Sequence, residues 1–148
     1  DKPIEIESDT MTMDDTKNVS IYTGDVILTQ GTLIIKADEL IVREDNQGFQ
    51  HSTSTGNPTS FKQKREGVEE YIEGIGQRIE YDGHMDKVHI YRNAIVKRGN
   101  DTVMGDYIIY DANAEVAQAM SSKSNNGEAN DTSKKKIRTK AIINPKKD

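Results

Sequence analysis

The stretch from Val19 to Arg43, VSIYTGDVILTQGTLIIKADELIVR, alternates β-branched or apolar residues with polar ones over most of its length. A period of two is typical of a β-strand with one buried face and one solvated face. Gln30-Gly31 has the composition of a turn and divides the stretch into two strands, and Gly24-Asp25 interrupts the first of them. We therefore expect a β-hairpin that buries one face.

The second strand of this hairpin changes phase. Leu33, Ile35 and Ala37 share one face, after which Leu40 and Val42 take over the apolar role. An extra residue near Asp38-Glu39 would produce this shift, and such β-bulges are common where a sheet curves. The alternation thus predicts a curved hairpin.

The hairpin pattern recurs about seventy residues later as VHIYRNAIVKRGNDTVMGDYIIYD, which begins at Val88. Val19 matches Val88 and Tyr22 matches Tyr91 at a spacing of 69, whereas Ala37-Asp38 matches Gly105-Asp106 at a spacing of 68. The chain is therefore expected to contain two copies of one hairpin layer that close around a long apolar interior.

The composition supports an all-β chain. It contains 17 isoleucines and eight valines but only three leucines, and branching at Cβ suits a pleated sheet better than a helix. No segment of ten residues has a convincing helical period. Only 33% of the residues are hydrophobic, with two Phe and no Trp, so bulky side chains for a thick core are scarce. A thin pair of sheets around an open slot is expected.

The 148 residues are enough for one domain, 1–148, and the remaining segments are assigned by composition. Short alternation in 4–14 predicts an opening strand, and the polar segment from Glu44 to Pro58 is interpreted as a loop with at most a weak edge strand. Low-complexity residues 121–135 predict a flexible loop, which is followed by a last strand at 136–144.

Charge and residue content exclude several classes of function. The net charge of −5 argues against a nucleic-acid partner, because phosphate binding needs a basic face. The absence of Cys excludes disulfides, Cys-zinc sites and Cys catalysis. No run of 18 apolar residues exists to span a membrane. The chain starts at Asp1 without an apolar leader, so we expect a signal peptide to have been removed.

The chemistry-bearing residues predict neither an enzyme nor a metal site. His51 is expected in a loop, His84 in a turn and His89 on the solvated face of a strand, with no zinc-like spacing. The carboxylate pairs at turns lack the calcium-loop pattern. No catalytic metal, cofactor or nucleophile with its base is expected. Lys134–Lys136 could contact anionic headgroups or only keep the tail soluble, and both readings stay open.

The apolar face is the stronger signal. Its inward phase is expected to hold Ile4, Ile6, Met11, Met13, Ile21, Leu28, Leu33, Ile35, Phe61, Ile79, Tyr81, Ile90 and Val103. These residues could form an ordinary sandwich core. Two features favour an open slot over a filled core: the shortage of bulky aromatics, and end strands with the character of exposed edges.

Several motifs resemble a known family. PIEIESD near the start, VSIYTGDVILTQGTLIIKAD in the first hairpin, GNPTSF before the middle strand and MGDYIIYD in the second hairpin are similar to the LptA family. These are periplasmic lipopolysaccharide-transport proteins of Gram-negative bacteria with an OstA-like domain. The similarity covers roughly residues 3–120 and also the last strand. Arg92-Asn93-Ala94 and the segment 121–133 depart from the family pattern.

The resemblance implies a β-jellyroll whose two antiparallel sheets form a V-shaped slot, open at both ends, that holds the acyl chains of lipid A. It implies a periplasmic bridge that passes lipopolysaccharide from an inner-membrane complex to an outer-membrane translocon. The implied partners are lipopolysaccharide, related jellyroll domains of an inner-membrane-anchored protein and of the translocon, and further copies joined head to tail.

Two alternatives remain open at this point. The chain could be an adaptor jellyroll with a dry interior that binds only protein through its edges. It could also be the periplasmic domain of another member of the same transport system. The absence of a membrane segment favours the soluble member.

Overall fold

The computed structural model describes residues 2–48, 50–65, 67–111, 114, 116–121 and 138–144. This part of the chain consists of strands and turns and contains no helix. The strands are β1 (Glu5–Glu7), β2 (Thr10–Asp14), β3 (Val19–Gln30), β4 (Leu33–Glu44), β5 (Gln50–Lys64), β6 (Tyr71–Asp82), β7 (Lys87–Arg98), β8 (Asp101–Asp111), β9 (Val116–Met120) and β10 (Lys140–Ile142).

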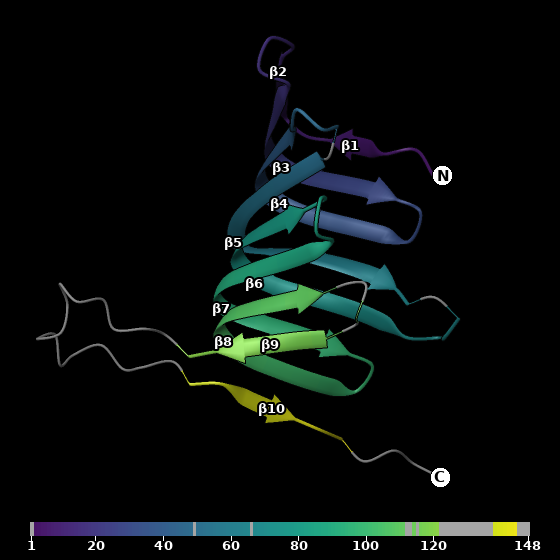
Figure 1. Ribbon diagram of the computed structural model, residues 1–148, viewed down its shortest axis with the longest axis vertical. Helices are drawn as coiled ribbons and strands as arrows, with labels where there is room; N and C mark the ends of the chain where they lie inside the picture. Colours follow the sequence, from purple (N-terminus) through teal and green to yellow (C-terminus); the bar gives the residue numbers. More distant parts are fainter. Residues whose placement is uncertain are drawn as a thin grey trace, which may run out of the picture.

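All strand pairs are antiparallel and belong to one hydrogen-bonded sheet. Strands β3 to β8 follow one another in sequence order, so each long strand is paired with its neighbours along the chain. Two short strands, β1 and β2, pair with β3 at one end, and β9 and β10 pair with β8 at the other. The strands stack like the steps of a ladder along the long axis of the molecule (Figure 1).

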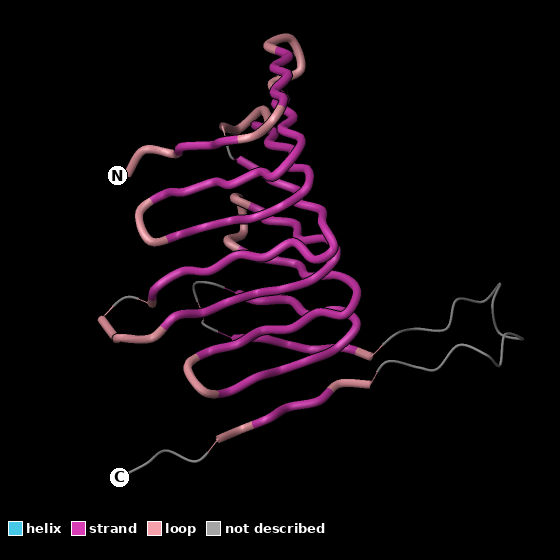
Figure 2. Tube along the Cα trace, turned by 180° about the vertical axis from the view of Figure 1, so that it is seen from behind, coloured by secondary structure: helices cyan, strands magenta, loops and turns pink. Residues whose placement is uncertain are grey.

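Each long strand bends near its middle, where the register shifts. Shifts lie between Thr23 and Val26 in β3, and between Lys36 and Glu39 in β4, and similar shifts recur in β5, β6 and β7. The bulge predicted near Asp38-Glu39 is thereby confirmed. Extra residues in one strand of a pair bend it and increase its twist. Seen from behind, the strands turn back along one side of the molecule (Figure 2).

The bends divide the sheet into two halves that we name after their edge strands. The β2–β9 half contains β2, Val19–Thr23, Glu39–Glu44, Gln50–Thr55, Arg78–Asp82, Lys87–Tyr91, Tyr107–Asp111 and β9. The β1–β10 half contains β1, Val26–Gln30, Leu33–Ala37, Thr59–Lys64, Tyr71–Ile75, Ala94–Arg98, Asp101–Gly105 and β10. The two layers of the expected jellyroll are thus the two halves of the same strands.

Side chains from both halves meet in the interior. One cluster joins Phe61 and Val96 of the β1–β10 half to Ile90 and Ile108 of the β2–β9 half. A smaller cluster around β3 and β4 joins Leu28 to Tyr22 and Leu40. Because each cluster draws on both halves, the halves face one another. The all-β jellyroll predicted from the sequence is confirmed.

The polar segment between Glu44 and Pro58 is not a loop, and this prediction was wrong. Strand β5 starts at Gln50 and pairs with β4 on one side and β6 on the other, in the middle of the sheet. Its Ser and Thr side chains are compatible with a strand, but they do not give the apolar alternation that predicts a buried face. Only the turn at 45–48 matches the expectation.

The structure describes only part of the C-terminal segment. The last strand, expected at 136–144, is observed over Lys140–Ile142, and residues 136 and 137 lie outside the described residues. The flexible loop expected at 121–135 lies outside them too, apart from Ser121, as does Lys134–Lys136.

Candidate lipid-binding face

The inward residues of the β2–β9 half form rows that cross the strands. The deeper row consists of Met11, Tyr22, Leu40, Ser54, Ile79, Ile90, Ile108 and Ala119, each opposite the next in the strand register. Most of its members are apolar, and Leu40, Ile90 and Ile108 are fully buried. A second row of the same inner face lies two residues away along each strand, farther from the bend, and we call it the rim row. It consists of Met13, Ser20, Val42, Ser52, Tyr81, Val88, Tyr110 and Ala117.

The β1–β10 half presents a matching row. Its members are Ile6, Leu28, Ile35, Phe61, Gly74, Val96, Val103 and Ala141. This row faces the rows of the other half, because Phe61 and Val96 share a cluster with Ile79 and Ile90. The two halves therefore enclose an apolar interior that runs across all the strands from one edge of the sheet to the other.

The rows become more polar away from the bend. The deeper row has two hydroxyl groups, on Tyr22 and Ser54. The rim row has four, on Ser20, Ser52, Tyr81 and Tyr110. An apolar floor below a hydroxyl-bearing rim suits an amphiphile, whose chains avoid water while its polar part requires hydrogen bonds.

Tyr81 shows how the rim holds a polar group beside apolar ones. Its hydroxyl donates to Asp86 Oδ1 at 2.8 Å, in the turn between β6 and β7. Burial, together with this bond and the negative charge of Asp86, raises the pKa of Tyr81 to about 12. The phenol therefore keeps its proton, and with it the hydrogen-bond donor, into the alkaline range.

One buried polar pair lies inside the apolar interior at the bend of β5. Thr59 is fully buried, and its hydroxyl lies 2.7 Å from the carbonyl oxygen of Lys36 and 3.0 Å from Ser54 Oγ. The Lys36 carbonyl lies at the bulge of β4, where the ladder is interrupted. Thr59 thus donates a hydrogen bond to a backbone acceptor at the bend.

Most of the predicted residues lie in or beside these rows. Inward positions are taken by Ile6, Met11, Met13, Leu28, Leu33, Ile35, Phe61, Ile79, Tyr81, Ile90 and Val103. Phe61, Ile79, Ile90 and Leu28 are buried, whereas Leu33, Ile35 and Val103 are only partly buried against the clusters. Met11 and Met13 are 59% and 61% exposed at the sheet edge, and Ile4 precedes β1 and is 44% exposed.

Ile21 is the exception, and its inward placement was wrong. It pairs with Ile41 on the outer face and is exposed, while its neighbour Tyr22 points inward and is buried. The error comes from the repeat spacing, because 69 residues would match Ile21 to the inward Ile90. The bulged residues Gly24-Asp25 and Arg92-Asn93 all have positive φ and correspond at 68, so Tyr22 is the true counterpart of Ile90.

A repeat of 68 also relates inward residues that the list of candidates left out. It matches Val26 to Ala94, Leu40 to Ile108 and Val42 to Tyr110, all of them on the inner face. The match between Ala37-Asp38 and Gly105-Asp106 already showed this spacing in the sequence. Applying it to the first strand would have matched Tyr22 to Ile90 and placed Tyr22 on the inner face.

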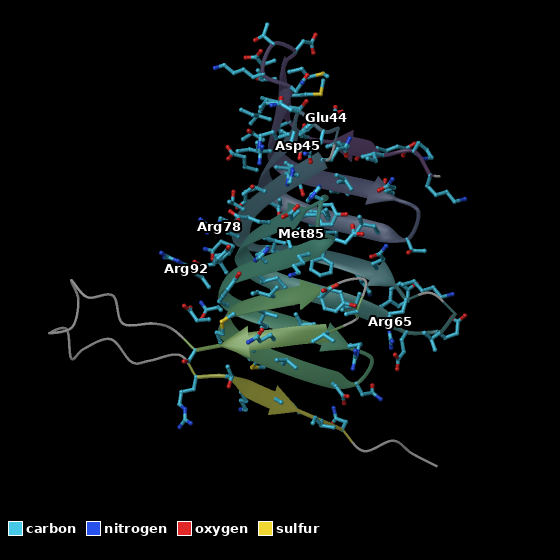
Figure 3. All side chains as sticks on the ribbon, viewed as in Figure 1. Glu44, Asp45, Arg65, Arg78, Met85 and Arg92 are labelled. Carbon is cyan, nitrogen blue, oxygen red and sulfur yellow. The ribbon has the colours of Figure 1, made fainter. Side chains whose placement is uncertain are left out.

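The outer face carries a ring cluster on β6, β7 and β8. Tyr91 and Tyr107 stack with centroids 4.8 Å apart, and Arg78 lies 4.2 Å from the Tyr91 centroid. Arg78 projects beside the bend, near Arg92 (Figure 3). Burial, with the neighbouring Tyr91 and Glu80, raises the pKa of Tyr107 to about 12.

The three histidines have different surroundings. His89 lies on the outer face as predicted, with Nδ1 2.6 Å from the Tyr107 hydroxyl. His51 is not in a loop: it belongs to β5, with Nε2 2.9 Å from Asp45 Oδ2 and Nδ1 3.5 Å from Asp82 Oδ1. His84 lies in the turn after β6, where its amide donates to Asp82.

Within the described residues, no group of three or more His, Asp or Glu side chains is placed to hold a metal ion. The same part of the chain has no helix that is long and apolar enough to cross a membrane.

Comparison with known proteins identifies the fold family. A family model described as "LptA/(LptD N-terminal domain) LPS transport protein" matches residues 5–116. The lipopolysaccharide export system protein LptA of Escherichia coli K12 is 34% identical over 125 residues, which cover 83% of this chain and 67% of that protein. The lipopolysaccharide export system protein LptH of Pseudomonas aeruginosa is 28% identical over 120 residues, or 80% of this chain and 69% of LptH.

A solved structure gives the same result. The crystal structure of LptH, described as the LptA-homologous periplasmic component of the lipopolysaccharide transport device of Pseudomonas aeruginosa, superposes with a TM-score of 0.83 at 25% identity. The superposition covers 97% of this chain and 96% of LptH. By family model, sequence identity and fold, this chain belongs to the LptA/LptD N-terminal domain family of LPS transport proteins.

Proposed function

We propose that this protein carries lipopolysaccharide through the periplasm by shielding the lipid A acyl chains between the two halves of its sheet. The observation that carries the proposal is the set of inward rows, which are mainly apolar and reach both edges of the sheet. Exposing a CH₂ group to water costs about 0.8 kcal/mol, so a long acyl chain needs a covered path. Family membership supports the same cargo.

The depth of burial suggests where the chains lie. Leu40, Ile90 and Ile108 are fully covered by the protein itself and form the floor. Leu33, Ile35, Val88 and Val103 point inward but are only partly buried, so they retain apolar surface for a ligand. The chains are proposed to lie against this second set, with the polar part of the lipid at the hydroxyl-bearing rim.

The proposal assigns no catalytic step and no cofactor to this chain. Apolar contact binds an acyl chain without fixing its position along the rows, so the lipid can slide in either direction. The energy for directed transport must then come from another component. In this scheme the chain receives lipopolysaccharide from an inner-membrane complex and passes it to an outer-membrane translocon.

The sheet edges are the proposed partner sites. Among the strands that the structure describes, β1 and β2 pair only with β3, and β9 and β10 pair only with β8, so both ends of the sheet offer unpaired backbone groups. Unpaired edges bind other strands by β-augmentation. The proposed partners are related jellyroll domains of an inner-membrane-anchored protein and of the translocon, and further copies of this chain joined head to tail.

Adjacent isoleucines offer a matched test of lipid binding. Ile35 points inward and Ile34 points outward and is exposed. A photoreactive amino acid at Ile35 or Phe61 should crosslink to lipopolysaccharide in cells, and the same group at Ile34 or His89 should not. Crosslinking from the outward positions alone would contradict the proposal.

A second function, an adaptor with a dry interior, is favoured by the complete burial of Leu40, Ile90 and Ile108 among side chains of the protein itself. It predicts that no inward position crosslinks to lipid, while photoreactive groups on the edge strands still crosslink to protein. The experiment above therefore separates the two functions.

A further inference from the structure

The inward rows end on side chains of very different size at the two edges of the sheet. At the β1 and β2 edge, the rows end on Ile6, Met11 and Met13. At the β9 and β10 edge, the same three rows end on Ala141, Ala119 and Ala117, respectively. One edge therefore has large side chains on its inner face, and the other has small side chains at the matching positions.

The strand directions allow both halves of the sheet to continue into another copy. Each half has eight antiparallel strand segments, so its first and last strands run in opposite directions. When a second copy in the same orientation follows the first, its β2 is antiparallel to β9 and its β1 is antiparallel to β10. Two ladders can therefore form at one junction.

We propose that successive copies join in the register that continues every row, with Met11 beside Ala119 and Met13 beside Ala117 of the neighbouring copy. This inference rests on the proposed head-to-tail association and adds its register and its selectivity. In the other half, Ile6 then lies beside Ala141. Bulky side chains cover the alanines, and the apolar interior passes from one copy into the next without a polar gap.

The outer face of the junction agrees with this register. The outward row that begins at Glu7 ends at Lys140, so these opposite charges face one another across the junction. Opposite charges that are directly paired across strands are favourable, and like charges are not. A shift of two residues is the smallest that keeps the faces, and in either direction it leaves one methionine opposite a position beyond β9. Met11 then faces Ala117 while Met13 lies past the start of β9, or Met13 faces Ala119 while Met11 faces Ser121. The proposed register is therefore favoured by side-chain size in the β2–β9 half, and by both side-chain size and charge in the β1–β10 half.

The flexible methionine side chains of β2 can pack against a partner surface that does not match their shape closely. Met11 and Met13 are 59% and 61% exposed in the isolated chain, which is unfavourable unless a partner covers them. Methionine adapts its shape to a shallow apolar surface better than branched side chains do. A second copy that offers alanines provides such a surface, with room for both side chains.

Cysteine pairs can read the register directly, because the chain contains no Cys. Thr12 and Gln118 are the two ends of one outward row, so they face one another in the proposed junction. Under mild oxidation, the T12C/Q118C variant should form a ladder of disulfide-linked dimers and larger species. The T12C/V116C variant, shifted by two residues, should give about a tenth of that yield, because a disulfide needs Cα atoms roughly 4.4–6.8 Å apart.

Light scattering of the protein without added cysteines tests whether the methionines and alanines of the junction match in size. Met11→Ala should raise the dissociation constant about tenfold, as expected for loss of a buried methionine side chain. Ala119→Met should weaken association as well, because two methionines then compete for one space. The M11A/A119M variant exchanges the two sizes and should recover affinity to within about threefold of the unmodified chain, if packing volume is what matters.

The outcomes separate the register from the association itself. Concentration-dependent growth with crosslinking at the shifted pair, or no recovery in M11A/A119M, would overturn the register and leave head-to-tail association standing. A chain that stays monomeric at all concentrations, with no crosslinking from either cysteine pair, would overturn both.

Discussion

The Phe61 ring lies directly over Gly74, its partner on the neighbouring strand β6. A Cβ atom built on Gly74 would overlap the ring, so the absence of a side chain is what lets the phenyl group pack against this position of β6. Phe61 is one of two phenylalanines in the chain and belongs to the larger interior cluster. A bulky group is thus accommodated in a thin interior by a glycine opposite it.

Gly74→Ala should destabilise the fold, because the added methyl group displaces the Phe61 ring from its place. Overpacking of this kind costs about 1–3 kcal/mol. The free energy of unfolding from urea titration measures it. The double variant G74A/F61L should recover part of the loss, since leucine leaves room for the methyl group. Equal stability of Gly74→Ala and the unmodified chain would show that the ring is not held there.

Thr59→Val should lower stability by about 1–3 kcal/mol, although it preserves the shape of the side chain. The change removes the hydroxyl that bonds the Lys36 carbonyl at 2.7 Å and leaves that oxygen and Ser54 without this partner. Ser60→Ala, one position along on the outer face, is the control and should change stability by less than about 0.5 kcal/mol. Urea unfolding of the two variants compares them.

Leu40→Ala should cost about 2–5 kcal/mol, because Leu40 is fully buried between β3 and β5. Ile21→Ala should cost less than about 1 kcal/mol, since Ile21 lies on the exposed outer face. Thermal or urea unfolding measures both changes. A larger effect at Ile21 than at Leu40 would mean that the faces are assigned the wrong way round.

Stability should fall at alkaline pH because of Tyr81 and Tyr107, whose pKa values are raised in the folded chain from 10 to about 12. Between these values the unfolded chain loses phenolic protons that the folded chain keeps, so unfolding becomes more favourable as pH rises. Their contribution is fully present below pH 10 and disappears as the pH passes about 12.

Absorbance of tyrosinate during a pH titration provides the check. The unmodified chain should show a late-titrating fraction of its six tyrosines, and both Tyr81→Phe and Tyr107→Phe should reduce that fraction. Tyr71→Phe is the control, because Tyr71 is 47% exposed. A late fraction that is unchanged in Tyr81→Phe and Tyr107→Phe would contradict the assignment.

Much of the fold could be read from local pattern. Alternation with a period of two predicted strands throughout, and the phase change after Ala37 located the bulge of β4. It also placed Leu28, Leu33 and Ile35 on the inner face. These features depend on residues close together in the chain, where the pleat alone decides which side chains share a face.

Strand β5 could not be read in the same way. Its first half, from Gln50 to Thr55, carries mostly hydroxyl and other polar side chains and resembles a loop. It is a strand because β4 and β6 supply backbone partners on both sides. Hydrogen bonding by two neighbours compensates for weak local preference, and that contribution depends on the whole sheet.

By itself, the sequence determined that the chain forms long alternating strands and where one of them bends. Only the tertiary structure decided which face of the first half of β3 is inside. Ile21 and Tyr22 are both compatible with burial by local pattern, but the bulge at Gly24-Asp25 sets Tyr22 opposite Leu40, in the row that also contains Ile90. Alternation defines two faces equally well, and a face becomes the inner one only when the other half of the bent sheet packs against it.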